Sequence, residues 1–590
     1  MAARGFARVA PLRAKAAFYA LALVAAYLTW RLVDVQIRQG PRLAREAMSQ
    51  RSETLELFAK RGAILDRDGA ALVRSLPSES VYAVPTNVAD PRAAAAALAP
   101  LVGSKPPVLE SVLRERSQFR WLARKISHET AEKIRALNIL GVYTKPEETG
   151  VRFAPSGHLA STVLGFVGMD EDGLGGIEYA FNSYLHGVGG KMRIEADQFG
   201  RAIPFAETTV VERARAGRNL ELTLDSYLQF EAERALAAQV KKFQARSGTA
   251  IVMDPWTGEI LALANVPDFE PAHFSRYSPD AWRDRGVMDA YEPGSTFKLI
   301  TAAAALEGRK SGPDSRFPAR DTLQAGGRTI HNAEDGLMAG NHGTESLEDI
   351  IAYSHNVGAA EVGIKTGPAQ MYRTIRRFGF GEPTHVELPG ENPGIVPGVA
   401  DWSGSSLATI SFGHGVSTTP LGLIRAYAAI ANGGVLLRPR IVRALYDEAG
   451  NVTYRYPAEI ERRAISARTA ATLRRYLRAA VMRGTGNPTA HVAGYTTAGK
   501  TGTAQVVENG RYEPGAYIAS FVGYIPADRP KFVILVKVER PRGSIYGSEV
   551  AAPVFAQLAR TAMLHAGDMP AAPPRKPRLV RGAAAAKDGR

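Results

Sequence analysis

The chain has 590 residues, too many for one hydrophobic core, so we expect two or more domains. A hydrophobic content of 45% and a charged content of 22% are typical of globular domains. The absence of cysteine excludes disulfides, thiolate catalysis and cysteine-based zinc sites. A net charge of +15 suits an anionic membrane surface or nucleic acid, but the basic residues form no single block, so no nucleic-acid partner is expected.

The N-terminal segment has the charge and hydropathy profile of a membrane anchor. Residues 16–30 are uncharged and mostly apolar, and they follow a basic segment that contains Arg4, Arg8, Arg13 and Lys15. If Arg31 extends to the interface, the apolar stretch approaches the roughly 20 residues that span a bilayer. We predict a cytoplasmic tail over 1–15 and a transmembrane anchor over 16–36 of the inner membrane, with the bulk of the chain periplasmic. A cleaved signal peptide and a buried soluble helix are the alternatives.

Residues 37–215 show no catalytic constellation, and we predict a structural or docking domain, here called the pedestal domain. A polar helix or linker is expected over 39–60, a hairpin turn at Asp68-Gly69, and an alanine-rich helix over 91–101. The glycines of 165–176 are interpreted as turns, because no strand–GxGxxG–helix or Walker pattern surrounds them.

Residues 216–568 are predicted to form an α+β domain. Strand patterns occur near both ends of this segment, at 219–224, 248–253, 259–263, 517–524 and 532–538. Helical patterns occupy 226–242 and 553–566 and most of 296–480, including 350–362, 368–377 and 420–432. The early and late strands should therefore meet in one antiparallel sheet covered by helices. Residues 569–590 are rich in proline, alanine and basic residues and should form a disordered basic tail.

Ser295 is the first candidate for catalysis. The turn residues Pro293 and Gly294 precede it, and the apolar run 297–306 follows, which predicts a helix starting at or just before Ser295. Lys298 is three residues later and so lies on the same helix face. A serine hydroxyl needs a neighbouring base, and a lysine can be that base if burial or a nearby cation lowers its pKa. Taken alone, Ser295 could equally be a helix N-cap and Lys298 a solvated surface residue.

Ser354-His355-Asn356 is the second candidate stretch. If it forms an extended turn, Ser354 and Asn356 point to the same side and supply a hydroxyl and an amide that can relay a proton and hold a substrate amide. Taken alone, it is an ordinary turn at the start of a helix.

Lys500-Thr501-Gly502-Thr503 is the third candidate stretch, and its β-branched surroundings predict a strand. The lysine and the two hydroxyls suit a carboxylate. Gly502 lacks a side chain, so a substrate could lie against the strand edge. A second Lys-Thr-Gly at 365–367 ends a helical run before Pro368 and is interpreted as a helix C-terminus without a catalytic role.

Ser-x-x-Lys, Ser-x-Asn and Lys-Thr-Gly, in that order, form a specific combination, and the chain resembles a class B penicillin-binding protein from the anchor to about residue 565. The middle motif has histidine where the quoted pattern has aspartate. Further stretches similar to family blocks are 61–69, 176–182, 413–420 and 546–555. The resemblance is strongest to the cell-division, FtsI-type branch, with the elongation branch as the alternative.

The resemblance implies a membrane-anchored peptidoglycan D,D-transpeptidase of the D,D-carboxypeptidase class, whose catalytic domain has the fold of serine β-lactamases. It implies that Ser295 is the nucleophile, Lys298 the base, Ser354 the proton relay and Asn356 the group that holds Lys298 and the donor amide. Lys500, Thr501, Gly502 and Thr503 would bind the terminal carboxylate of the stem peptide. β-Lactams would acylate Ser295, and no metal or cofactor is implied. An FtsW-type glycosyltransferase and other division proteins are the implied partners.

Two other functions share some of these features. A serine β-lactamase has the motifs but lacks a front half of about 200 residues, and it needs a water-activating carboxylate that the sequence does not identify. A non-catalytic division scaffold would keep the anchor and the pedestal domain, with the motifs as relics.

Overall fold

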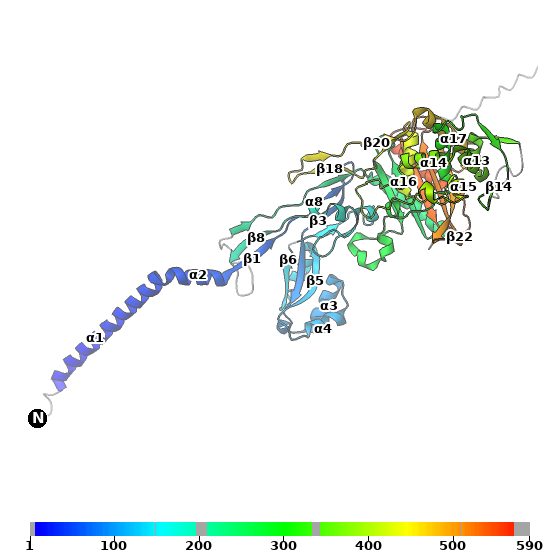
Figure 1. Ribbon diagram of the computed structural model, residues 1–590. Coiled ribbons are helices and arrows are strands. Elements are labelled where there is room, and N and C mark those ends of the chain that lie inside the picture. The colour runs from blue at the N-terminus through cyan, green and yellow to red at the C-terminus, as the bar shows by residue number, and fades with distance from the viewer. Residues whose placement is uncertain (1–5, 148, 196–208, 333–342, 509, 571–590) are drawn as a thin grey trace, which may run out of the picture.

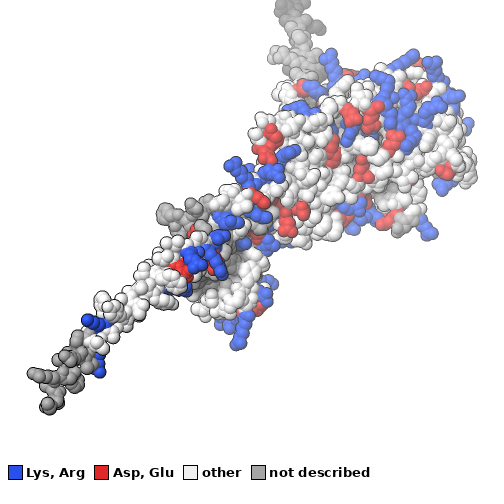
Figure 2. All heavy atoms as spheres, turned by 60° about the vertical axis from the view of Figure 1, so that its left-hand side comes forward, with Lys and Arg blue, Asp and Glu red and all other residues white. Residues whose placement is uncertain are grey.

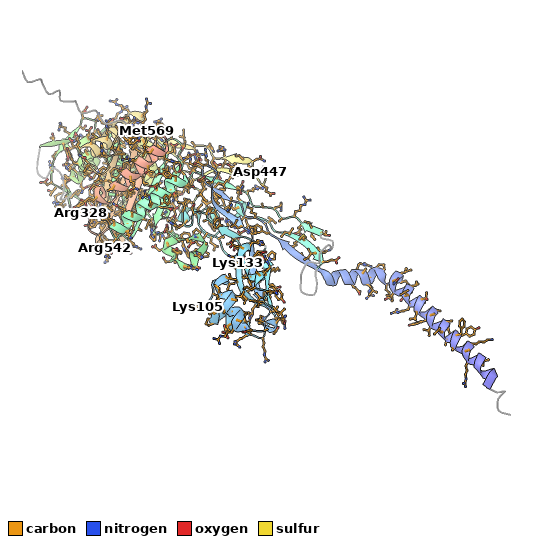
Figure 3. All side chains as sticks on the ribbon, turned by 180° about the vertical axis from the view of Figure 1, so that it is seen from behind. Lys105, Lys133, Arg328, Asp447, Arg542 and Met569 are labelled. Atoms are coloured by element: carbon orange, nitrogen blue, oxygen red, sulfur yellow. The ribbon has the colours of Figure 1, made fainter. Side chains whose placement is uncertain are left out.

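The computed structural model describes residues 6–147, 149–195, 209–332, 343–508 and 510–570. The molecule is elongated, with an N-terminal helix projecting from one end and the predicted catalytic domain at the other (Figure 1). Arg328 marks the end farthest from that helix, and Lys105 and Lys133 mark a small lobe that projects from the middle (Figure 3). The predictions for residues 1–5 and 571–590 of the two tails lie outside the described residues.

The N-terminal helix α1 (Phe6–Val33) is long and apolar enough to cross a membrane, as judged by the segment Leu12–Arg38. Its described side chains are mostly exposed, which contradicts the alternative of a buried soluble helix. The helix is largely uncharged between basic residues near its ends (Figure 2). It continues through a π-helical segment, Asp34–Arg38, into α2 (Gly40–Arg51). Part of the predicted 39–60 linker is instead the strand β1 (Ser52–Leu57), which pairs with β8 (Gly190–Glu195).

The small lobe is a three-stranded sheet with helices packed against one face. Its strands lie in the order β5-β4-β6, and buried residues of α3, α4 and α5 form a separate core with β4. The predicted helix at 91–101 is α3, which Asp90 caps through the N–H groups of Arg92 and Ala93. The elements of the lobe are β4 (Ser78–Ala83), α3 (Pro91–Val102), α4 (Pro106–Leu113), β5 (Arg120–Ser127), α5 (His128–Ala136) and β6 (Val142–Pro146).

A six-stranded sheet joins the pedestal domain to the catalytic domain. Its order is β19-β18-β10-β2-β3-β7, and the Asp68-Gly69 turn connects β2 to β3 as predicted. The predicted boundary at 215–216 falls within the segment between β9 (Thr209–Glu212) and β10, and one hydrophobic core contains residues from both sides of it. The strands are β2 (Ile64–Leu65), β3 (Ala71–Leu76), β7 (Val151–Phe153), β10 (Leu220–Leu222), β18 (Val442–Tyr446) and β19 (Val452–Arg455).

The glycines of 165–176 form turns as expected. A Cβ on Gly165 would lie 1.8 Å from the carbonyl oxygen of Gly175, so two backbone segments pack where no side chain fits. The short helices α6 (Ser161–Leu164), α7 (Gly176–Ala180) and α8 (Asn182–Leu185) border these turns.

The catalytic domain is built on a five-stranded antiparallel sheet of order β12-β11-β23-β22-β21. Strands from residues 247–266 and 498–539 are neighbours in it, which confirms that these early and late strands share one sheet. The strand predicted at 219–224 is an exception, because β10 lies in the six-stranded sheet, where it pairs parallel with β2. Because helices cover both faces, β11 is buried along its whole length. The strands are β11 (Ser247–Met253), β12 (Ile260–Val266), β21 (Ala498–Glu508), β22 (Arg511–Ile525) and β23 (Phe532–Glu539).

The helices α9 (Ser226–Lys242) and α19 (Ala552–His565) share a core with one face of this sheet. The helix α16 (Pro420–Ala431) contributes its buried side to the core that contains residues of α11, α12 and α13. The other helices are α10 (Arg285–Met288), α11 (Lys298–Glu307), α12 (Leu347–Tyr353), α13 (Asn356–Thr366), α14 (Pro368–Arg377), α15 (Ser406–Ile410), α17 (Ala467–Met482) and α18 (Gly547–Val550).

The prediction of a mostly helical region over 296–480 is wrong in part, because short strands interrupt the helices. Their alternating patterns are too short to stand out from the surrounding turns. These strands are β13 (Arg316–Pro318), β14 (Thr322–Ala325), β15 (Arg328–His331), β16 (Thr344–Ser346), β17 (Val435–Leu437) and β20 (Ile460–Arg463), in addition to β18 and β19. Two pairs are local hairpins, β14 with β15 and β18 with β19, whereas β13 pairs with β16 and β17 with β20 across longer segments.

Candidate active site

Ser295 lies on a 3-10 turn, η5 (Gly294–Phe297), that leads directly into α11. The prediction of a helix beginning at or just before this residue is therefore confirmed, with a tighter first turn. Gly294 has φ of +55°, and a Cβ there would lie 2.9 Å from the carbonyl oxygen of Thr503. This approach requires glycine, and it places the nucleophile turn against β21.

The Lys298 side chain is fully buried one helical turn after Ser295. Its ammonium donates hydrogen bonds to the carbonyl oxygen of Ser354, to Ser354 Oγ at 3.1 Å and to Asn356 Oδ1 at 2.7 Å. The structure thus brings the first and second motifs together, as the sequence suggested. Burial, reinforced by the positive charge of Lys500, holds the pKa of Lys298 well below its usual range, against a weaker opposing effect of Glu345.

The Ser-His-Asn motif lies in a break between α12 and α13, so the helical pattern over 350–362 is interrupted, whereas the turn at the start of a helix expected at 354–356 is confirmed. Ser354 adopts a left-handed conformation with φ of +65° and ends α12. Such a conformation costs about 1–3 kcal/mol for a residue other than glycine and persists only when its surroundings hold it. The resulting turn directs both Ser354 and Asn356 towards Lys298. The Asn356 amide donates to the carbonyl oxygen of His331 at 3.1 Å, which leaves its own oxygen for the lysine.

Lys500, Thr501, Gly502 and Thr503 lie on β21, as predicted, and β21 is an edge strand of the sheet. Lys500 is fully buried, and its ammonium lies 3.3 Å from Thr501 Oγ1 and 3.4 Å from Thr485 Oγ1. Burial lowers the pKa of Lys500 to about 7. The two lysines therefore belong to one site, because the positive charge of Lys500 is close enough to lower the pKa of Lys298.

Gly502 has a packing role that the sequence did not reveal. A Cβ at this position would lie 2.4 Å from Ser520 Oγ and 3.0 Å from the Thr296 methyl group. The missing side chain therefore lets the nucleophile turn and β22 approach β21. The open edge of β21 for a substrate comes from its place in the sheet rather than from this glycine.

Sequence reasoning missed Thr485, whose hydroxyl lies 2.8 Å from Thr501 Oγ1. Its signal in the sequence is weak, since only the flanking Gly484 and Gly486 mark a tight turn. Glu345 was also not identified from the sequence, and its carboxylate lies 2.5 Å from Nδ1 of His355 in the second motif. Glu345 is buried on β16, and only the fold brings its charge within electrostatic reach of Lys298.

The second Lys-Thr-Gly, at 365–367, lies at the end of α13 and contacts residues other than those of the three motifs. Lys365 and Thr366 end α13, and Gly367 has φ of +84° before Pro368, as expected for a helix C-terminus. The Lys365 ammonium lies over the ring of Phe317. Within the described parts of the chain, no group of three or more His, Asp or Glu residues is placed to hold a metal ion.

Comparisons with known proteins identify two family models along the chain. The model of the penicillin binding protein transpeptidase domain matches residues 248–560, and that of the penicillin-binding protein dimerisation domain matches residues 56–222.

Curated relatives match nearly the whole chain. Stage V sporulation protein D of Bacillus subtilis is 35% identical over 92% of this chain and 83% of its own length. Peptidoglycan D,D-transpeptidase FtsI of Escherichia coli is 30% identical over 90% of this chain and 88% of its own length.

Solved structures agree with these relatives. The crystal structure of penicillin binding protein 3 from Mycobacterium tuberculosis, complexed with aztreonam, has a TM-score of 0.67 and 30% identity and covers 88% of this chain and 99% of that chain. On the family models, the relatives and the shared fold, the chain belongs to the class B penicillin-binding proteins and is a transpeptidase of the serine, penicillin-binding type.

Proposed function

We propose that this protein cross-links peptidoglycan stem peptides during septum synthesis, with Ser295 as the acylated residue. The observation that carries the proposal is the environment of Lys298. A fully buried ammonium, held by Ser354 and Asn356 beside a second buried cation, is a lysine prepared to lose its proton. The curated relatives named peptidoglycan D,D-transpeptidase support the choice of substrate.

Acylation begins when Ser295 Oγ attacks the carbonyl carbon between the two D-alanines of a donor peptide. Lys298 takes the hydroxyl proton, and the N–H groups of Ser295 and Thr503 stabilise the oxyanion. The carbon–nitrogen bond then breaks, and Ser354 passes the proton from Lys298 to the leaving D-alanine. The product is an ester between Ser295 and the donor.

In this scheme the strand β21 binds the donor substrate. Lys500, Thr501 and Thr503 bind the terminal carboxylate, and Gly502 keeps the strand close to the nucleophile turn. Asn356 holds both Lys298 and the donor amide. The amine nitrogen of a second stem peptide then forms a bond to the ester carbon, the bond from that carbon to Ser295 Oγ breaks, and one proton of the amine passes to Ser295. The product is the cross-link.

We also propose the placement of the chain in the cell. The basic residues before the apolar segment 16–30 put the N-terminus in the cytoplasm and the remainder in the periplasm, because positive flanks stay inside. In this arrangement 1–15 is the tail, 16–36 the anchor, 37–215 the pedestal domain and 216–568 the transpeptidase domain, followed by the 569–590 tail. An FtsW-type glycosyltransferase would contact the anchor and the pedestal domain.

The intact mass of the full chain in detergent, measured after incubation with penicillin, tests the chemistry. We expect one stable adduct per chain and none in the Ser295→Ala variant. An adduct that survives this substitution would refute the assignment of the nucleophile, and an adduct that is hydrolysed quickly would favour a β-lactamase.

The cellular role needs a separate test, because the relatives have different names and the chemistry is common to both branches. A fluorescent fusion is expected at mid-cell, and a signal spread along the side wall would indicate elongation instead. Normal growth supported by the Ser295→Ala variant alone would favour the scaffold.

A further inference from the structure

Glu292, His414 and Tyr512 form a titratable cluster outside the three motifs. The Glu292 carboxylate accepts the N–H of Gly415 at 2.7 Å and the hydroxyl of Tyr512 at 3.0 Å, and it lies 3.4 Å from His414 Nδ1. The three side chains come from the segment before η5, from the segment between α15 and α16, and from β22. They are neighbours only in the folded protein.

The cluster adjoins the nucleophile turn. The Gly294 N–H donates to the carbonyl oxygen of Gly413 at 3.2 Å, and a Cβ on Gly413 would lie 2.2 Å from the carbonyl oxygen of Gly294. His414 is also within electrostatic reach of Lys298: burial, and then the lysine charge, lower its pKa to about 4. At neutral pH His414 is therefore uncharged and does not neutralise Glu292.

Glu292 also lines a cavity of about 750 Å³ that extends along the second half of β21. The other acidic residues of this cavity each have an arginine or lysine partner. Asp280 pairs with Arg285, Asp289 with Arg283, Glu508 with Arg540, and Glu539 with Lys537. Within the described part of the chain, the ion-pair partner found for Glu292 is the uncharged His414. Among the acids that line this cavity, Glu292 is therefore the one whose carboxylate is available to bind an external cation.

We propose that Glu292 binds the ammonium group of the acceptor substrate and takes its proton before the amine attacks the acyl-enzyme. This inference rests on the proposed function, and it identifies a carboxylate for the second half-reaction. The acceptor is a primary amine that arrives protonated and enters through the 750 Å³ cavity.

Two protons leave the acceptor ammonium during the transfer, one to Glu292 and one to Ser295. One N–H proton of the ammonium passes to a Glu292 oxygen, which leaves a neutral amine. Its nitrogen forms a bond to the ester carbon, the bond from that carbon to Ser295 Oγ breaks, and the second amine proton returns to Ser295 through Lys298. The products are an amide, a free serine and a protonated Glu292, which then releases its proton to water.

The test measures how one acyl-enzyme divides between water and an amine. The full chain in detergent is acylated with an N-acyl-D-alanyl thioester in the presence of D-alanine, and mass spectrometry gives the ratio of amide to hydrolysis product. Because the ratio is taken after acylation, it does not depend on the acylation rate. Hydroxylamine, which is uncharged at neutral pH, is the comparison nucleophile.

We expect Glu292→Gln to lower the D-alanine ratio by about a hundredfold, the lower end of the range for a lost proton acceptor. The hydroxylamine ratio should not change, because that amine needs neither charge recognition nor deprotonation. Glu292→Asp keeps the charge and should restore part of the ratio. Asp289→Asn, which alters a paired acid of the same cavity, is the matched control and should leave both ratios unchanged.

Either of two results would overturn the proposal. An unchanged D-alanine ratio in Glu292→Gln would show that the carboxylate has no part in transfer. An equal fall for D-alanine and hydroxylamine would show that Glu292 only maintains the turn at Gly415. Failure of the wild-type protein to form any acyl-enzyme would instead refute the proposed function itself.

Discussion

The pedestal domain and the active site both bury cations, but only the pedestal domain pairs them closely with a carboxylate. Arg61 is fully buried and donates to Glu178 Oε2 at 2.8 Å, to the Glu171 carbonyl oxygen and to Asn182 Oδ1. Arg152 donates to the other oxygen of Glu178 at 2.8 Å. One carboxylate thus holds two guanidinium groups, and the cluster ties the segment before β2 to α7.

The two active-site lysines have different partners. Their hydrogen-bond acceptors among the described residues are neutral oxygens of Ser354, Asn356, Thr485 and Thr501. A buried cation without a carboxylate in contact loses its proton easily, whereas an ion pair keeps it. Burial with a carboxylate therefore suits Arg61 to a structural tie, whereas burial among neutral oxygens suits Lys298 to the base role proposed for it.

Replacing the catalytic lysine should have the largest effect. Lys298→Ala should slow acylation by β-lactams by about 10²- to 10⁴-fold, because the base that accepts the Ser295 proton is lost. The measurement is the second-order rate of adduct formation by rapid mixing. A near-normal rate would assign the base role to another group.

The next effect is on stability rather than on chemistry. Arg61→Ala removes one partner of a buried ion pair and should lower the free energy of unfolding by about 3–5 kcal/mol. Arg124→Ala, which removes a partly exposed partner of Glu147 in the small lobe, should cost about 0.2–1 kcal/mol. Urea unfolding followed by tryptophan fluorescence compares the two variants. Equal losses would contradict the structural importance of the Arg61 cluster.

The pH dependence of acylation tests whether the two active-site lysines, unlike Arg61 in its ion pair, change protonation state. Lys298 acts as a base only when deprotonated, so the rate should fall as pH decreases through its lowered pKa. Lys500 binds a carboxylate only when protonated, so the rate should also fall as pH rises above about 7. The rate constant at low β-lactam concentration should therefore follow a bell-shaped curve.

Lys500→Arg provides the control for this curve, because arginine does not titrate in this range. The variant should lose the decline at high pH whatever its absolute rate. A decline that persists in the variant would mean that another group sets the alkaline limit.

The smallest effect is expected at the second Lys-Thr-Gly. Lys365→Ala should leave the acylation rate unchanged, because this side chain lies over Phe317 at the end of α13. A clear loss of rate would show that this helix end supports the site in a way that its contacts do not reveal.

Local patterns in the sequence predicted much of the fold. The helices over 226–242 and 368–377 were placed with the bounds found for α9 and α14, because their starts have an Asp225 cap and a proline at the first position. At Ser354 the sequence carried two signals, a helical pattern over 350–362 and a turn at the start of a helix over 354–356, and the structure follows the second. The left-handed turn there is maintained by contacts with distant residues such as Lys298.

For the site, residue types and their order were enough to single out Ser295, Lys298, Ser354, Asn356 and Lys500–Thr503, because each motif combines a reactive group with a recognisable start of a helix or strand. Thr485, Glu345 and the Glu292 cluster have no such local signal. Each consists of common residues whose importance comes from their neighbours in space.

The sequence by itself determined which side chains are available for acyl transfer and which segments form helices and strands, because both depend on nearby residues. Only the tertiary structure decided that Lys298 and Lys500 are buried together, with neutral oxygens as their hydrogen-bond acceptors among the described residues, and that Arg61 is buried with a carboxylate. The reason is physical: a pKa depends on burial and on charges brought close by folding, and these come from residues far apart in the chain.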